Sequence, residues 1–217
     1  MAKQGLRFVV IGLALDLIGA AVLIGGVLGH RSASFWLGAV LVALASLFTA
    51  FCVYFFRDPE RMLPTDPKKI YSPGDGRVMS VAREGPGDVV TLRIFLSVFD
   101  VHIQRAPCAG AVEKVQHVAG SFKAAMMDEA KANERCVMTI VPEGRQDRLV
   151  VEQIAGLIAR RIECWPEPGE RLKSGERYGI IYFGSQAAVH FPASARCTVK
   201  PGDRVAGALS EIGEWTS

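Results

Sequence analysis

The segment from Tyr178 to Pro192 reads YGIIYFGSQAAVHFP. Its branched and aromatic residues are typical of a β-strand, which Gly184 and Ser185 interrupt before the strand resumes and ends at the proline. A glycine inside a strand costs stability, so its presence indicates a bulge or a close approach of the backbone. A hydroxyl directly after a glycine also reaches the glycine carbonyl carbon with little steric hindrance. The segment therefore predicts either a bulged strand with a surface serine or a strand that carries a reactive serine.

Charge is distributed unevenly along the 217 residues. The first 56 residues carry only four charged side chains, which are Lys3, Arg7, Asp16 and Arg31. Removing these from the totals of 25 basic and 22 acidic residues leaves 22 basic and 21 acidic residues after position 56. The remainder of the chain is thus nearly neutral, which argues against nucleic acid as a partner.

Two apolar segments, 8–28 and 35–56, each contain about 21 residues, enough for a helix to cross a hydrocarbon core of about 30 Å. The apolar residues cover every face of both helices, which favours membrane spans over a buried soluble hairpin. We therefore predict a transmembrane hairpin over residues 1–56 and a separate domain over 57–217. Asp16 lies within the first span and is assigned no role.

The basic residues that flank the spans predict their orientation. Only Arg31 lies in the short connection between the spans. The basic residues outside the hairpin precede the first span or follow the second, and they are Lys3, Arg7, Arg57, Arg61, Lys68 and Lys69. Because basic residues concentrate on the cytoplasmic side, both ends are expected in the cytoplasm, with the second domain on the cytoplasmic side of the cell (inner) membrane.

The second domain has short strand-like segments separated by glycine and proline. The predicted strands are 77–82, 89–96, 111–118, 136–141, 148–154 and 179–183, and the best helix candidate is 122–131. Segments 199–207 and 173–179 resemble the Gly-Asp hairpins of barrel-sandwich hybrid folds such as lipoyl carriers. The expected fold is mainly β with a few short helices, similar to a barrel-sandwich hybrid, after the two-helix hairpin.

The five cysteines are scattered, odd in number and lack Cys-x-x-Cys spacing, so neither a zinc site nor a disulfide framework is predicted. Buried thiols in a reducing compartment are the better interpretation.

Two further segments contain residues suited to catalysis. His102 follows Asp100 at even spacing in FLSVFDVHIQRAP, residues 95–107, which would place both on one strand face. An ordinary buried histidine near a strand end is the alternative. Asp75 lies in SPGDG, residues 72–76, which is also a good turn by composition alone. His190 is five residues after Ser185, an odd separation that disfavours a catalytic role.

Taken together, Tyr182-Phe183-Gly184-Ser185, the SPGDG segment and the segment around His102 resemble the phosphatidylserine decarboxylase family in its short Phe-Gly-Ser form. The resemblance extends through most of the chain, including Asn133-Glu134-Arg135 and the two N-terminal spans. It departs at Arg105, which stands where longer members have a second histidine. Gln186 and Ala188 stand where the family commonly has arginine and aspartate.

The resemblance implies a proenzyme that cleaves itself between Gly184 and Ser185, giving chains 1–184 and 185–217 that remain associated. Ser185 is converted to a pyruvoyl group, the cofactor that decarboxylates phosphatidylserine to phosphatidylethanolamine, so no metal and no pyridoxal phosphate are expected. His102 is the implied base, Asp75 is its implied partner, and Arg105 is a candidate for binding the substrate. A carboxylate beside a histidine fixes its tautomer and stabilises its protonated form.

Alternative functions remain open at this level. Archaetidylserine is a possible substrate because the headgroup chemistry is the same, and a non-enzymatic membrane-tethered barrel-sandwich scaffold is the alternative from another class. A serine hydrolase is disfavoured, because the Gly-x-Ser-x-Gly elbow and the alternating strand-helix pattern of α/β-hydrolases are absent.

Overall fold

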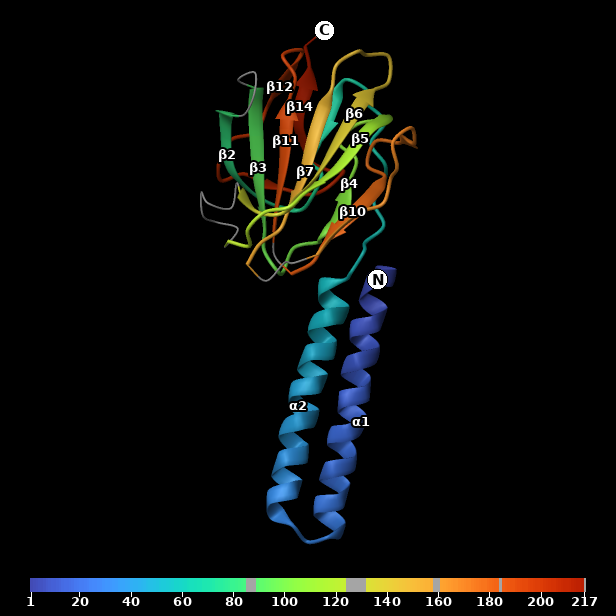
Figure 1. Cartoon of the computed structure of the whole chain (residues 1–217), viewed down its shortest axis with the longest axis vertical. Helices are drawn as coiled ribbons and strands as arrows, with labels where there is room; N and C mark the ends of the chain where they lie inside the picture. The colour runs from blue at the N-terminus through green and yellow to red at the C-terminus, as the bar shows by residue number, and fades with distance from the viewer. Residues whose placement is uncertain (85–88, 124–131, 158–160, 184, 217) are drawn as a thin grey trace. The chain divides into compact units, whose positions relative to one another are not determined.

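The computed structural model describes residues 1–217 except 85–88, 124–131, 158–160, 184 and 217. It divides into two compact units, Met1–Pro59 and Glu60–Ser217. The first unit is helical and the second is built of strands (Figure 1). This confirms the predicted fold class.

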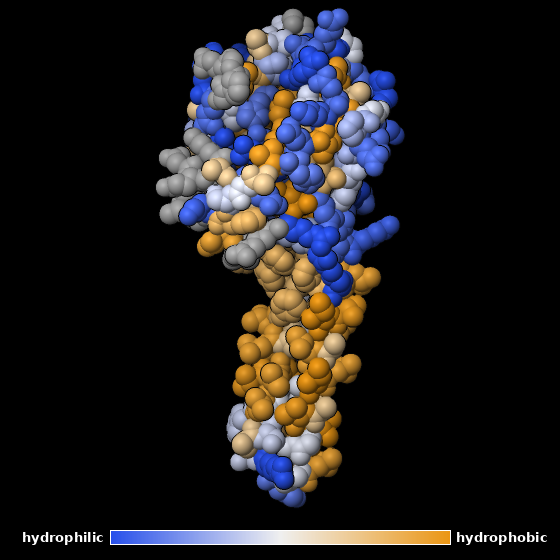
Figure 2. Space-filling model, in the orientation of Figure 1, coloured by the Kyte–Doolittle hydropathy of each residue, from blue (hydrophilic) through white to orange (hydrophobic). Residues whose placement is uncertain are grey.

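The helical unit is an antiparallel pair. A 3₁₀ turn, η1 (Lys3–Gly5), leads into α1 (Leu6–Leu28), and α2 (Ser32–Phe55) follows after a three-residue connection. Hydrophobic side chains cover most of the visible surface of the helical unit, and hydrophilic ones gather at the end where the two helices are connected (Figure 2). Each helix is long and apolar enough to cross a membrane.

Small residues spaced seven apart line the contact between the two helices. The buried residues include Gly12, Gly19 and Gly26 on α1, and Gly38, Ala45 and Cys52 on α2. A Cβ added at Gly26 would lie 2.4 Å from the amide nitrogen of Phe35, and one at Gly38 would lie 2.4 Å from that of Leu23. A seven-residue period keeps one face of each helix on its partner, and the small residues let the backbones approach closely.

Asp16 lies on α1 and accepts a hydrogen bond from Ser46 Oγ on α2 at 2.8 Å. The acidic residue within the first apolar segment therefore faces the partner helix, where a polar contact offsets part of the cost of its burial in an apolar environment.

The described residues of the second unit form three sheets, whose larger strands are labelled in Figure 1. The largest has eight strands, in the order β13 (Arg204–Val205), β2 (Gly76–Glu84), β3 (Val89–Leu96), β11 (Ser185–Phe191), β7 (Leu149–Ile154), β6 (Arg135–Pro142), β5 (Gly110–Val118), β9 (Arg171–Leu172). The second sheet has the order β1 (Lys69–Tyr71), β14 (Glu211–Trp215), β12 (Ala195–Cys197). The third has the order β4 (Ile103–Arg105), β10 (Arg177–Ile181), β8 (Ile162–Cys164). All pairings within these sheets are antiparallel.

One apolar core holds the sheets together. Its members include Leu92 and Ile94 on β3, Val189 on β11 and Val151 on β7, all almost completely buried. Side chains that alternate along neighbouring strands fill a single interior, which is the main source of stability for a sheet of this kind. The core thereby fixes the position of β11 in the middle of the largest sheet.

The predicted strands correspond to β2, β3, β5, β6, β7 and β10, with shifts of a few residues at their ends. The strand predicted over 179–183 ends earlier, at Ile181, because Phe183 has a positive φ of 59° that no β-strand accommodates. The predicted tail hairpin is incomplete, since Val199 and Lys200 lie outside any strand. Most of the helix candidate, 124–131, lies outside the described residues.

Candidate active site

Ser185 is the first residue of β11 and lies opposite Leu96 of β3. Its neighbour Gln186 pairs with Ile154 of β7, so the serine begins a strand that has a partner on both sides. The Ser185 side chain is fully buried, and among the described residues its Oγ has no hydrogen-bond partner. A buried hydroxyl without a partner is costly, which marks this position as one kept for a purpose other than stability.

The two residues before Gly184 are held in an unusual turn. Phe183 adopts the left-handed region at φ 59°, which is strained for a bulky residue. The backbone amide of Tyr182 donates to the carbonyl of Arg161 at 3.1 Å. The Tyr182 hydroxyl donates to Glu163 Oε1 at 2.7 Å, and that oxygen lies 2.9 Å from Arg161 Nη2. Gly184, half of the predicted cleavage site, lies outside the described residues.

His102 is buried in the connection between β3 and β4. Its Nδ1 lies 3.0 Å from the carbonyl oxygen of Asp100, which can only accept a hydrogen bond, so Nδ1 carries the proton. This leaves Nε2 as the basic nitrogen of the neutral ring. The carbonyl of His102 accepts from the amide of Ile181 at 3.3 Å, which ties the histidine to the strand that leads toward Ser185.

The relation expected between Asp100 and His102 is wrong. Residues 97–102 form a turn and an irregular segment instead of a strand, so the two side chains do not share a strand face. The Asp100 carboxylate accepts from the backbone amide of Ser97 at 2.9 Å, and the Asp100 amide donates to the Ser97 carbonyl at 2.8 Å. A short polar side chain that captures a local amide favours a turn over continued sheet pairing.

Asp75 precedes β2, and its carboxylate is held by residues that the sequence did not point to. Arg61 binds it in a bidentate manner, with Nη1–Oδ1 at 2.7 Å and Nη2–Oδ2 at 2.8 Å. The amide of Gly207 donates to Oδ1 at 2.8 Å. Among the described residues, the partners of Asp75 are thus Arg61 and Gly207, whereas the resemblance implied His102.

Arg105 ends β4 and is buried to 2% exposure, unusual for an arginine. Its Nη1 donates to the carbonyl of Gly175 at 3.1 Å. The amide of Arg105 donates to Pro73 at 2.7 Å, which joins β4 to the segment that carries Asp75. Ser185, His102 and Arg105 are therefore all buried in the same unit, and Asp75 lies on a loop bonded to β4.

Sequence reasoning missed Glu163, Arg161 and Arg61 as contributors to this region. Arg61 appeared only as a determinant of membrane orientation. Glu163 lies in the short strand β8, which the sequence pattern did not predict because three residues give no periodicity. The tyrosine at 182 was a usable signal, since a buried tyrosine hydroxyl normally finds a polar partner.

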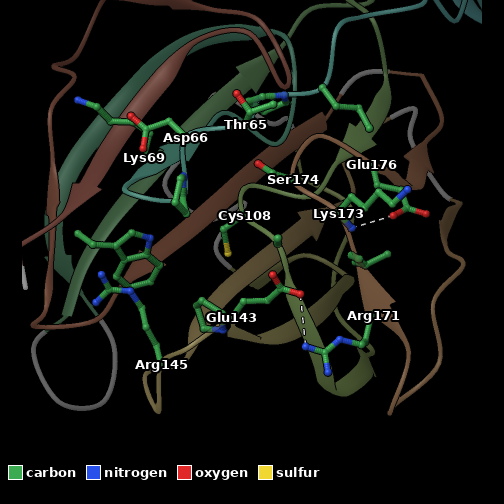
Figure 3. A pocket seen from close by; sticks show the side chains of 17 residues that line it. Thr65, Asp66, Lys69, Cys108, Glu143, Arg145, Arg171, Lys173, Ser174 and Glu176 are labelled. Carbon is green, nitrogen blue, oxygen red and sulfur yellow. Dashed lines mark hydrogen bonds and ion pairs between the residues drawn. The ribbon is translucent and has the colours of Figure 1, made fainter.

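Two cavities lie away from these residues. One of about 620 Å³ is lined by charged side chains around Cys108 and Trp215 (Figure 3). Its charges are largely paired, as Arg171 with Glu143, and burial raises the pKa of Cys108 to about 12, which makes the thiol unreactive at neutral pH. A second, of about 550 Å³, lies beside His190 and Glu152. No candidate catalytic residue lines either cavity.

The His190 side chain contacts polar side chains of the neighbouring strands in the largest sheet. Its Nδ1 lies 2.9 Å from Thr91 Oγ1, and its Nε2 lies 3.3 Å from Glu152 Oε1. Burial raises the pKa of Glu152, but His190 and the positive charges of Arg135 and Arg93 together outweigh it, so this pKa is lowered overall. These contacts give His190 a structural role in the sheet.

Comparison with known proteins identifies the family. The family model described as phosphatidylserine decarboxylase matches residues 48–212. The chain belongs to the phosphatidylserine decarboxylase family. The phosphatidylserine decarboxylase proenzyme of Symbiobacterium thermophilum is 47% identical over 183 residues, covering 82% of this chain and 83% of that protein. The corresponding proenzyme of Anaplasma phagocytophilum is 39% identical over 221 residues, covering 99% of this chain and 91% of its own length.

Membership in the decarboxylase family confirms the predicted resemblance. The matched region begins within α2 and includes every candidate site residue, from Asp75 to Ser185. The relatives are named as proenzymes, that is, as precursors that require processing. The unusual turn before Ser185 therefore lies within the part of the chain that the family shares.

Proposed function

We propose that this protein is a membrane-anchored phosphatidylserine decarboxylase that activates itself by cleavage between Gly184 and Ser185. The observation that carries the proposal is the buried Ser185 Oγ without a described partner, two residues after the left-handed Phe183. The turn at Phe183 breaks the strand immediately before the serine, and the burial of Ser185 keeps water from competing with its hydroxyl. Family membership supports this use of the site.

Cleavage begins when Ser185 Oγ adds to the Gly184 carbonyl carbon. The Ser185 nitrogen leaves and takes a proton, so an ester replaces the amide. Removal of the Ser185 α-proton then breaks its Cβ–O bond, which releases Gly184 as a carboxylate. Addition of one water and loss of ammonia leave a pyruvoyl group at position 185. The first step is unfavourable in free peptides, so the fold must hold the hydroxyl and the carbonyl in position to react. Such orientation lowers the barrier of intramolecular reactions by about 7–11 kcal/mol.

His102 is the proposed base for the serine hydroxyl. The Asp100 carbonyl keeps its Nδ1 protonated and its Nε2 basic, the state that a general base requires. Asp75 is the proposed supporting carboxylate, which needs an exchange of its partner from Arg61 to the histidine. Arg105 stays protonated at physiological pH and therefore suits the binding of a substrate carboxylate or phosphate instead of proton transfer.

A pyruvoyl group at position 185 supplies a carbonyl that condenses with the serine amine of the headgroup and accepts the electrons left by carbon dioxide. The site fits such a group. Ser185 is fully buried, and its Oγ has no hydrogen-bond partner among the described residues. His102 holds and returns the proton that the product requires, and burial of the site excludes bulk water from the reaction.

The strand pairing supports the retention of the small chain after cleavage. Residues 185–217 include β11, which pairs with β3 over seven residues and with β7 over five. They also include β13 and β14, which pair with β2 and β1 of the large chain. The hydrogen bonds of these ladders do not depend on the peptide bond before Ser185, so the two chains are proposed to form one heterodimer.

Membrane anchoring by α1 and α2 is part of the proposal. Confinement at the bilayer raises the effective concentration of a lipid substrate. The basic residues Arg57 and Lys68 after α2 are proposed to attract anionic lipid at about 1 kcal/mol each near a charged surface, whereas Lys69 is paired with Glu211 and Glu214.

Intact mass and a decarboxylation assay test the proposal. The purified protein is expected as fragments of 184 and 33 residues, the smaller with a blocked N-terminus, and to release carbon dioxide from phosphatidylserine. Ser185→Ala is expected to stay whole and inactive, because no hydroxyl remains to attack. Active protein that consists of one intact chain contradicts the mechanism.

A further inference from the structure

Two exposed apolar side chains stand at the end of the sheet where Ser185 lies. Phe99 is 65% exposed and follows the end of β3, and Leu157 is 59% exposed and follows the end of β7. β3 and β7 are the two neighbours of β11, and Leu96 and Ile154 pair with its first two residues. The register therefore places both side chains beside the start of β11, one on each side.

The turn that carries Phe99 is held in place by its own hydrogen bonds. Ser97 and Asp100 exchange two hydrogen bonds, from the Ser97 amide to the Asp100 carboxylate and from the Asp100 amide to the Ser97 carbonyl. The Phe99 amide donates to Ser97 Oγ at 3.3 Å. A fixed turn thus presents an aromatic ring to solvent three residues before the buried His102.

The loop on the other side is fastened as well. The Asn133 side chain donates to the carbonyl of Ala155 at 2.8 Å and binds both the amide and the carbonyl of Lys123. It therefore joins the exposed Lys123 to the segment that ends in Leu157. Arg161, on the far side of Leu157, has a side chain that is 54% exposed, and its carbonyl accepts from Tyr182.

Phe99, Leu157, Lys123 and Arg161 together form a surface that we call the Ser185 rim. Single exposed apolar residues are common on soluble proteins. Two on separately anchored loops at one end of a sheet, beside a buried site that is proposed to receive a lipid headgroup, can insert together into the interface of a membrane. Charge does not favour docking here, because Asp100 and Glu163 keep their negative charge and Glu163 pairs with Arg161 at 2.9 Å. The two exposed apolar side chains therefore carry the proposed contact.

We propose that the Ser185 rim docks on the surface of a lipid bilayer, with Phe99 and Leu157 inserted among the lipid headgroups. This rests on the proposed function, in which a lipid headgroup must reach a residue that is completely buried. Moving the two acyl chains of the lipid from the bilayer into water costs free energy for every methylene group that becomes exposed. Seating the rim on the bilayer lets the headgroup enter the protein while the chains stay in lipid.

The test compares one headgroup in two physical states. Full-length protein is assayed for carbon dioxide release from phosphatidylserine in vesicles, and from a short-chain phosphatidylserine kept below its micelle concentration. For Phe99→Asp with Leu157→Asp, turnover in vesicles is expected to fall by roughly tenfold or more, since the loss of even one inserted apolar side chain lowers partitioning by about that factor. Self-cleavage and turnover of the short-chain lipid are expected to stay close to wild type.

Two control variants isolate the effect of the rim. Exchanging the two residues, Phe99→Leu with Leu157→Phe, keeps the rim apolar and is expected to preserve turnover in vesicles. Gln146→Asp adds an acid to the exposed β6–β7 loop, which the register places at the opposite end of the sheet, and is expected to have no effect. Equal losses on vesicles and on short-chain lipid for the double Asp variant overturn the proposal, because they indicate damage to the site itself.

A direct binding measurement separates this proposal from the proposed function. The measured quantity is the tryptophan fluorescence of each variant minus that of the wild type. For Phe99→Trp this difference is expected to be quenched by vesicles of phosphatidylserine and brominated phosphatidylcholine, and for Gln146→Trp it is not. No difference between the two overturns docking and favours a protein partner or a second copy at the rim. Wild-type protein inactive on both forms of lipid refutes the proposed function, whereas quenching at position 99 still supports the rim.

Discussion

The hydroxyl of Tyr182 donates a hydrogen bond to Glu163 Oε1 at 2.7 Å, two residues before Gly184. Glu163 belongs to β8, and the guanidinium of Arg161 contacts the same carboxylate oxygen. The backbone carbonyl of Arg161 also accepts a hydrogen bond from the amide of Tyr182. The side chain and the backbone of Tyr182 are thus both fixed, which confines the strained conformation to Phe183. In the proposed self-cleavage, a turn fastened at Tyr182 would favour a conformation for attack that the free chain rarely adopts.

Removal of this hydrogen bond is expected to slow maturation. Hydrogen bonds to charged groups contribute about 1.5–3 kcal/mol. If part of this energy is lost in the transition state of cleavage, the activation free energy rises and self-cleavage of Tyr182→Phe slows by roughly tenfold. Timed gels of newly synthesised protein measure the rate. Tyr178→Phe is the matched control, because the buried Tyr178 hydroxyl has no hydrogen-bond partner among the described residues. Similar slowing in both variants argues that a loss of packing, not of the Glu163 contact, is responsible.

His102→Ala is expected to accumulate the uncleaved chain and to have no decarboxylase activity, since one imidazole is proposed to serve both stages. A cleavage gel beside a carbon dioxide assay gives both readouts. His117→Ala, at an exposed position of β5, is the control and is expected to mature normally. Normal cleavage of His102→Ala with loss of decarboxylation restricts this residue to the lipid chemistry.

Asp75→Asn and Arg61→Gln distinguish two roles for the carboxylate. If Asp75 acts on His102 after exchanging partners, its substitution slows cleavage strongly, and loss of Arg61 has a much smaller effect. We expect this asymmetry in cleavage rates measured on timed gels. Equal slowing by both variants shows instead that the Arg61–Asp75 pair serves to hold the loop before β2, because the arginine side chain is only 8% exposed and depends on its counter-ion.

The lowered pKa of Glu152 predicts a loss of stability in acid. A carboxyl whose pKa is lower in the folded than in the unfolded state stabilises the fold above its unfolded pKa, and this contribution disappears as the pH falls through the folded pKa. Thermal unfolding of the wild type is therefore expected to shift downward from neutral pH toward pH 4. Glu152→Gln is expected to be less stable at pH 7, by about 1–3 kcal/mol, and less sensitive to acid. An unchanged pH dependence in this variant excludes Glu152 as the source.

The topology of the hairpin is tested with reporters. A fusion after Ser217 is expected to behave as cytoplasmic, and a tag between Arg31 and Ser34 to be accessible from outside, because of the basic residues at both ends of the hairpin. Digestion of the β-strand unit by protease added outside sealed cells reverses the assignment.

Local patterns predicted most elements of the fold. The six strands and the strand that resumes after Gly184, which is β11, were recognised from β-branched and aromatic residues bounded by glycine and proline. Both helices were recognised because long segments that are apolar on every face are typical of membrane spans. The short strands β1, β4, β8, β9, β12 and β14 were missed. With two to five residues each, they form only because neighbouring strands and the core hold them in place.

The partner of Asp75 could not be predicted for a different reason. Asp75 and Arg61 are 14 residues apart and Asp75 and Gly207 are 132 apart, with no periodic relationship between them. Only the folded chain brings these groups together. The same holds for Glu163 and Tyr182, which are 19 residues apart.

The sequence by itself determined the chemical groups and their local geometry: the two apolar helices, the serine after a glycine in a broken strand, and the histidine before a basic residue and a proline. These follow from side-chain type and short-range sterics, which act within a few residues. The tertiary structure alone decided that Asp75 pairs with Arg61 and that the strained φ falls at Phe183. It also placed Phe99 and Leu157 on either side of Ser185. Such relationships depend on strand register across the eight-stranded sheet, and register is set by packing of the whole core rather than by neighbouring residues.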